Sequence, residues 1–294
     1  MLKPFISGLL GLACAAGTAH AGWDYTTETK AEGGRQAQAQ NSKMHSLVDG
    51  AKARIDFVES QNPLMGAGTY LLTTDAGKNV RLVKPADKCY SEWDMKKMMG
   101  MAGGLMGMMN MKVKDQKSEK LLEEKGPSIL GFPTMHYKFR TSYTLEVSFM
   151  GMTQANATVN EQELWTTTAL TDAAFNFAAL QRDMKTGNDD LDKLVAAQMN
   201  KAEGFPLKSV MKNSAKDARG KEQSTTVTTE VLSVKQASIA ADQFVVPAGY
   251  EERDLNPMNA MLGGGKSKKD GGSQQNIDGN AIMKMLQEQM KQQQ

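Results

Sequence analysis

Residues 135–149, MHYKFRTSYTLEVSF, alternate between apolar and polar side chains, and this pattern constrains the fold more than any other feature. One side of the segment carries Met135, Tyr137, Phe139, Thr141, Tyr143, Leu145, Val147 and Phe149. Because side chains alternate across a strand, the pattern predicts one long antiparallel strand with an apolar face and a solvated face. At ~3.3 Å per residue the strand spans about 50 Å, which favours a large curved sheet or half-barrel over a small sandwich.

Further segments predict strands of the same sheet. They are residues 51–60, 69–74, 79–85, 88–93, 163–170, 206–213 and 225–236. Asp75-Ala76-Gly77-Lys78 separates two of them and predicts a hairpin turn. Because most of these strands are joined by short turns, we expect a meander.

Two segments predict helices that interrupt the strands. Residues 171–184 open with Thr171 as the N-cap, and residues 189–201 place apolar side chains on one face at helical spacing. The predicted fold class is therefore α+β: a large curved antiparallel sheet, an open half-barrel, with helices packed on its concave face.

The two ends of the chain differ in composition from its centre. Residues 1–21 have Lys3, an apolar run and Ala19-His20-Ala21, which together predict a cleaved signal peptide and a periplasmic location. Cys14 leaves a lipoprotein signal as the alternative. Residues 22–256 form the predicted half-barrel domain, and residues 257–294 are predicted to be a flexible linker followed by a short amphipathic helix.

Residues 95–113, MKKMMGMAGGLMGMMNMKV, contain eight methionines and four glycines. Wound as a helix, residues 95–109 gather most of their apolar side chains on one broad face. Three interpretations remain open: methionine as adaptable core, a surface for an apolar ligand, or a Cu(I) site built from thioethers. The residues predicted to line a ligand site are Met95, Met98, Met99, Leu105, Met106 and Met109, with Tyr137, Phe139, Tyr143 and Leu145 opposite them.

Several classes of function lack their usual signals in this sequence. The net charge is +2, without the basic block that nucleic-acid binding requires. We find no motif of a hydrolase, a metalloprotease or a phosphate-binding loop, so we predict a protein that is not an enzyme and needs no cofactor or resident metal. No segment predicts a transmembrane span. Cys89 is the lone cysteine after cleavage, so the fold has no internal disulfide.

An ordered set of short motifs resembles exported bacterial proteins of the domain of unknown function 4412 family. The motifs are Ile129-Leu130-Gly131-Phe132, Leu164-Trp165-Thr166, Gly204-Phe205-Pro206-Leu207, Thr228-Thr229-Glu230-Val231 and Phe244-Val245-Val246-Pro247-Ala248-Gly249-Tyr250. Phe132 stands where tyrosine is usual in that family. The resemblance implies an open half-barrel similar to the LolA/LolB lipoprotein carriers, whose sheet encloses acyl chains. Fold alone does not transfer an activity.

The sequence predicts a periplasmic binding protein with a Met-lined cavity for an apolar ligand: a lipid, an acyl chain or a hydrophobic protein segment. Two alternatives remain. One is an envelope interaction or stress protein that recruits a partner through its C-terminal tail. The other is a Cu(I)-binding protein that uses the methionine cluster.

Overall fold

The computed structural model describes residues 22–33, 35–100, 111–149, 152–173, 192–193, 202–216, 220 and 222–255. The strands are β1 (Gly22–Glu32), β2 (Ser42–Asp49), β3 (Lys52–Ser60), β4 (Tyr70–Thr73), β5 (Asn79–Lys84), β6 (Cys89–Asp94), β7 (Met111–Lys125), β8 (Met135–Phe149), β9 (Met152–Thr167), β10 (Phe205–Lys216), β11 (Glu222–Ala237) and β12 (Glu251–Glu252). The helical elements are α1 (Arg35–Gln38) and the 3-10 helices η1 (Pro85–Asp87), η2 (Thr168–Ala173) and η3 (Ala241–Phe244). Residues 95–100 and 192–193 are also helical.

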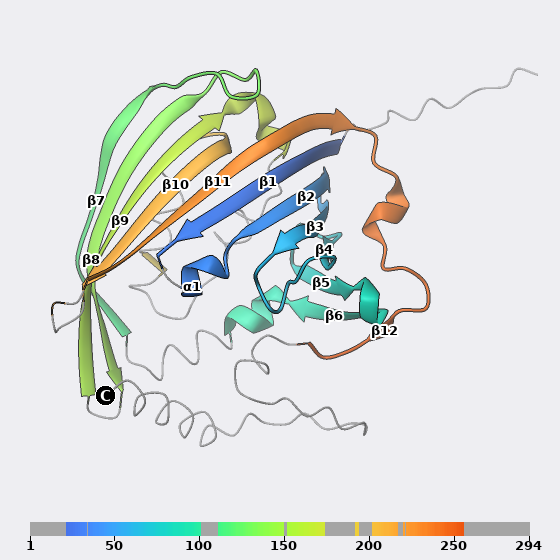
Figure 1. Cartoon of the computed structure of the whole chain (residues 1–294), viewed down its shortest axis with the longest axis horizontal. Coiled ribbons are helices and arrows are strands. Elements are labelled where there is room, and N and C mark those ends of the chain that lie inside the picture. The colour runs from blue at the N-terminus through green and yellow to red at the C-terminus, as the bar shows by residue number, and fades with distance from the viewer. Residues whose placement is uncertain are drawn as a thin grey trace, which may run out of the picture.

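All twelve strands belong to one sheet, which curls into an open half-barrel (Figure 1). The order across the sheet is β12-β6-β5-β4-β3-β2-β1-β11-β10-β9-β8-β7. Strands β1 to β6 form one run of consecutive neighbours and β7 to β11 form another, so the predicted meander is confirmed within each run. Antiparallel pairing of β1 with β11, from Gly22↔Ala237 to Glu32↔Thr226, joins the two runs.

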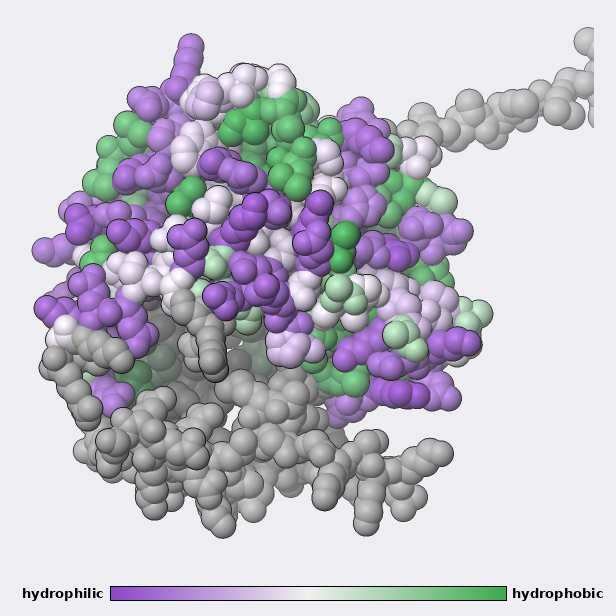
Figure 2. Space-filling model, viewed as in Figure 1, coloured by the Kyte–Doolittle hydropathy of each residue, from purple (hydrophilic) through white to green (hydrophobic). Residues whose placement is uncertain are grey.

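Strand pairing assigns each side chain to one of two faces. The ladder between β8 and β9 runs without a register shift from Met135↔Thr166 to Phe149↔Met152, so opposite residues share a face. Tyr137, Phe139 and Thr141 are buried on one face of β8. We call this face, and its continuation through the other strands, the inner face of the sheet. The opposite, outer face of β1, β10 and β11 is turned toward the viewer in Figure 1 and is covered largely by hydrophilic residues in Figure 2.

The main core cluster combines side chains of five strands with two connecting segments. Its buried members are Tyr25, Val48, Ala53, Leu170, Phe205, Leu207 and Val231, and Trp23, Ile129, Phe132 and Val234 pack against them. The rings of Tyr25 and Phe205 meet edge to face, with centroids 5.6 Å apart, a geometry that aromatic quadrupoles favour. Burial raises the pKa of the Tyr25 phenol, and a hydrogen bond with Ser46 opposes the shift.

Two β-bulges lie beside this cluster. The register of β1 against β11 shifts between Thr26 and Thr27. The register of β10 against β9 shifts between Pro206 and Lys208, which leaves Leu207 without a partner on β9. Because bulges bend and twist a strand, these two contribute to the curvature of the sheet.

The chain after β11 covers part of the outer face at the other end of the sheet. Tyr70, Leu72 and Val83 of β4 and β5 are buried there, with Tyr90, Val246 and Tyr250 packed against them. The backbone amide of Glu251 then donates to the Lys88 carbonyl (3.0 Å), and β12 pairs in parallel with β6. The motif from Phe244 to Tyr250 is therefore a structural cover over β4 and β5 (the orange segment of Figure 1).

The expected α+β class, with helices packed on the concave face, is wrong. Within the described ranges the chain is predominantly strand, and its α-helical residues are confined to α1, 95–100 and 192–193. The prediction assigned the burial of the apolar face to a helical layer. In the structure, side chains of five strands, together with η2 and the turn at Ile129–Phe132, bury one another. Of the two helices predicted, residues 174–191 and 194–201 lie outside the described residues, and residues 171–173 belong to η2.

Several local predictions are confirmed. The alternation at 135–149 matches β8, and Asp75-Ala76-Gly77-Lys78 joins β4 to β5 with positive φ at Ala76 and Gly77. Strands β1, β2, β7 and β12 were not predicted, nor were residues 152–162 of β9. Residues 1–21 and 257–294 lie outside the described residues, so the signal peptide, the tail and the domain limits stay predictions.

Candidate binding site on the inner face of the sheet

The four predicted site residues of β8 all lie on the inner face. Tyr137 and Phe139 are buried, with ring centroids 6.0 Å apart and ring planes within 11° of parallel. Tyr143 and Leu145 follow on the same face and are half-buried. The structure therefore places these four side chains in one apolar row along β8.

The predicted methionines are only partly described. Met95, Met98 and Met99 are half-buried in the helical residues 95–100, directly after β6. The Asp94 carboxylate accepts a hydrogen bond from the Lys97 backbone amide (3.0 Å) and so caps this helix. Leu105, Met106 and Met109 lie outside the described residues. The sheet order places eight strands between β6 and β8, so strand pairing does not bring Met95 to the Tyr137 row.

A second row, which the sequence analysis missed, lies beside the first on β9. Its inner-face members are Gln154, Asn156, Thr158, Asn160, Gln162 and Leu164, opposite Val147, Leu145, Tyr143, Thr141, Phe139 and Tyr137 respectively. The Asn160 Oδ1 atom is buried and has no hydrogen-bond partner. Neither face of this strand is apolar along its length, since the outer face mixes Ala155, Ala157 and Val159 with Glu161 and Glu163, so no sustained hydrophobic alternation marked it. The signal that was available is the spacing of amides and hydroxyls at every second position.

The inner face of β8, β9, β10 and β11 carries no charged side chain at the described positions. The neighbouring strand β7 differs, because Lys120, Glu123 and Lys125 lie on this face, opposite Phe139, Tyr137 and Met135, and Lys120 forms an ion pair with Glu123. Continuing the registered rows through β10, β11 and β1 gives Ser209, Met211, Asn213, Ala215, Thr229, Val227, Thr225, Gln223, Thr29 and Ala31. None of the inner-face positions on β8, β9, β10 and β11 described here is Asp, Glu, Lys, Arg or His. Met211 is 42% exposed, so this face is accessible to solvent at β10.

The charged side chains of the same strands lie on the outer face. Lys138 Nζ is 2.8 Å from Glu163, Arg140 Nε is 3.8 Å from Glu161, and Lys208 Nζ is 2.6 Å from Glu230. The Lys138 ammonium donates a hydrogen bond that lowers the pKa of the Glu163 carboxyl, and His136 adds to the effect. Exposed pairs of this kind contribute ~0–1 kcal/mol each, so their main effect is to keep the outer face solvated.

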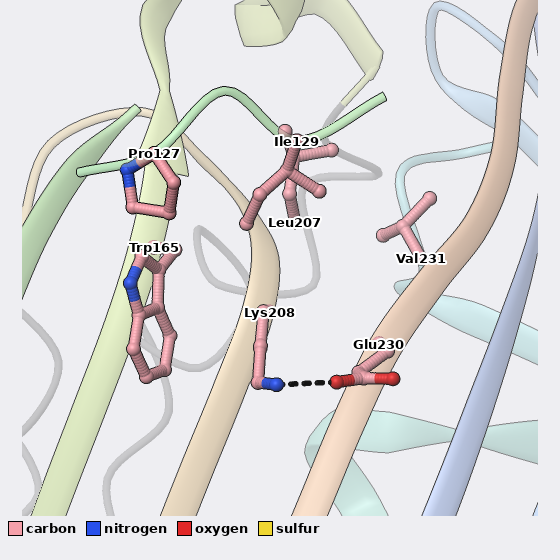
Figure 3. A pocket seen from close by; sticks show the side chains of 7 residues that line it. All are labelled: Pro127, Ile129, Trp165, Leu207, Lys208, Glu230 and Val231. Carbon is pink, nitrogen blue, oxygen red and sulfur yellow. Dashed lines mark ion pairs between the residues drawn. The ribbon is translucent and has the colours of Figure 1, made fainter. Parts of the chain in front are cut away.

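A hollow of about 370 Å³ opens where β9, β10 and β11 meet the β7–β8 connection (Figure 3). It is lined by Pro127, Ile129, Trp165, Leu207, Lys208, Glu230 and Val231. The imidazole of His136 stacks on the Trp165 indole with centroids 4.3 Å apart, and Lys208 Nζ lies 5.5 Å from the indole centroid. These contacts hold the indole as one rigid wall of the hollow.

Local hydrogen bonds fix the conformation of the β7–β8 connection that borders this hollow. Ile129 and Phe132 exchange backbone hydrogen bonds of 3.0 and 2.9 Å across Leu130-Gly131, where both φ angles are positive. The Thr134 hydroxyl donates to the Pro127 carbonyl at 2.7 Å. The Ile129 motif is therefore a tight hairpin turn that packs against the core cluster.

The described residues offer little for metal or catalytic chemistry. Among them, no group of three or more His, Cys, Asp and Glu side chains is placed to hold a metal ion. Cys89 is buried and unpaired. In the part of the chain that the structure describes, no helix has the length and apolarity needed to cross a membrane.

The fold and the two inner-face rows define a class: a β protein with a single open sheet, whose inner face carries an apolar row on β8 beside a neutral polar row on β9. The family model described as domain of unknown function (DUF4412) matches residues 35–250, and the chain belongs to this family. The predicted family is thereby confirmed, and the large antiparallel sheet fits the predicted half-barrel. The likeness to the LolA/LolB carriers stays a prediction.

Comparison with other proteins adds little beyond the family. No curated protein matches the chain. A solved structure described as PNGF-II in the P21 space group is similar at a TM-score of 0.33 with 14% identity, covering 82% of this chain. The chain spans 33% of the length of that protein.

Proposed function

We propose that this protein is exported to the periplasm and binds an apolar ligand on its inner face without catalysing a reaction. The ligand is a lipid, an acyl chain or a hydrophobic segment of another protein. The observation that carries the proposal is the uncharged row of Tyr143, Leu145 and Val147, whose side chains are only half-buried at the end of a buried aromatic pair. Apolar surface that remains accessible on an otherwise closed core is typical of a binding site.

The energy of binding would come from removing this surface from water. Burial contributes about 25 cal/mol per Å² of apolar surface, so an acyl chain that covers 200–300 Å² would gain roughly 5–7 kcal/mol before the entropic cost of association. The Lys and Glu side chains of the outer face offer no comparable apolar area, because they are engaged in ion pairs.

The proposal is tested with N-phenyl-1-naphthylamine, a dye that fluoresces in apolar surroundings. We expect the full mature chain to bind it, and the Tyr143→Ala and Leu145→Ala variants to bind at least about tenfold more weakly, a loss of 1.4 kcal/mol. Thr144→Ala, which lies between them on the outer face, is the matched control and should leave the affinity unchanged. Deletion of residues 257–294 should also leave it unchanged, whereas a tail-dependent partner would be lost. Equal effects of the inner and outer variants would refute the proposed site.

A further inference from the structure

We infer that the inner face selects an uncharged amphiphile, one with an apolar chain and a neutral, hydrogen-bonding head such as a glycerol ester. This inference rests on the proposed function and specifies its ligand class. It derives from the contrast between the two rows. On the inner face, β8 supplies apolar side chains, and β9 supplies amides and hydroxyls directly opposite them.

The two rows are matched residue by residue. Tyr143 lies opposite Thr158, and Leu145 lies opposite Asn156, so a chain lying along β8 has neutral polar groups beside it along its length. On β9, Asn156, Asn160 and Gln162 are half-buried, Thr158 is buried and Gln154, at the end of the row, is exposed. Carboxamides both donate and accept hydrogen bonds, which suits ester carbonyls and hydroxyls.

Asn160 gives the most direct indication that a ligand group belongs here. Its Oδ1 atom is buried and has no partner, although buried side-chain acceptors are nearly always satisfied. The atom lies on the inner face, opposite Thr141 of β8 and Asn213 of β10. A hydroxyl donor from a neutral head group would supply the missing hydrogen bond.

An ionised head group is disfavoured by the same face. Lys138, Arg140, Lys208 and Lys212 are all outer-face residues of β8 and β10, so they are on the wrong side of the sheet to pair with a carboxylate bound inside. On β7, Lys120 and Lys125 do lie on the inner face. Lys120 is paired with Glu123, and Lys125 lies opposite Met135 at the far end of β8 from Tyr143, so within the described strands a carboxylate beside Asn160 has no unpaired cation next to it. Burying an ion without a counter-charge is strongly unfavourable. A fatty acid should therefore bind more weakly than its neutral glycerol ester.

The experiment compares 1-monododecanoylglycerol with dodecanoate at pH 8, each displacing N-phenyl-1-naphthylamine from the full mature chain. We expect the ester to bind at least about tenfold more tightly than the ionised acid. Asn160→Leu should reduce this preference while the dye still binds. Asn156→Lys should raise the affinity for dodecanoate, and Ala157→Lys, one residue along and exposed on the outer face, should not.

The outcomes separate the two proposals. If dodecanoate and the ester bind equally well, and Asn160→Leu changes neither, the inference is overturned while the proposed function stands. If neither compound nor the dye binds the wild-type chain, the proposed function fails and the inference fails with it. If Ala157→Lys recruits dodecanoate as well as Asn156→Lys does, the assignment of the two faces is wrong.

Discussion

Replacing Leu207 by alanine tests the core that holds the two halves of the sheet together. Leu207 is fully buried, and the β-bulge after Pro206 places it in the cluster that also contains Tyr25 and Val231. The substitution removes three carbon groups at about 0.8 kcal/mol each, about 2.4 kcal/mol in total. The unfilled cavity adds to this, so we expect the free energy of unfolding to fall by about 3–4 kcal/mol.

Urea unfolding followed by circular dichroism measures this change, and the m-value should stay constant if only stability is altered. Met211→Ala is the matched control, because Met211 lies on the same strand and is 42% exposed. Its cost should be about 1 kcal/mol or less. If the two variants lose equal stability, the bulge and the register of β10 are not as described.

Two further predictions concern backbone strain and pH. Gly204→Ala should destabilise the protein at least twice as much as Gly68→Ala in the same urea assay. Both glycines have positive φ, which costs an alanine ~1–2 kcal/mol, but only at Gly204 would the new Cβ lie 2.6 Å from the Thr167 carbonyl oxygen. The pKa of Glu163 is lowered in the folded state, so its ion pair stabilises the protein at neutral pH, and this contribution is lost as the pH falls below the ordinary value of 4.5. Lys138→Met should therefore flatten the loss of stability below that pH, and Thr144→Val, on the same face, should leave the profile unchanged.

The sequence by itself determined the local structure wherever one face of a strand is apolar and the other polar. The alternation from Met135 to Phe149 predicted β8 and put Tyr137 and Phe139 on the same face. Successive side chains of a strand point to opposite faces, so apolar residues at every second position share one face. The Asp75 to Lys78 turn was predictable for a similar reason, since its glycine suits the positive φ that the hairpin requires.

Only the tertiary structure decided how the two runs of strands join and what the inner face carries. Pairing of β1 with β11 connects residues about two hundred positions apart, and no local periodicity encodes such a partner. The row from Gln154 to Gln162 was missed because neither face of β9 is apolar along its length. The face on which these side chains lie is fixed by the pairing of β9 with β8 and β10. The α+β prediction was wrong for a related reason. Burial of an apolar face can come from a helical layer or from the curl and bulges of the sheet itself, and local pattern does not distinguish the two.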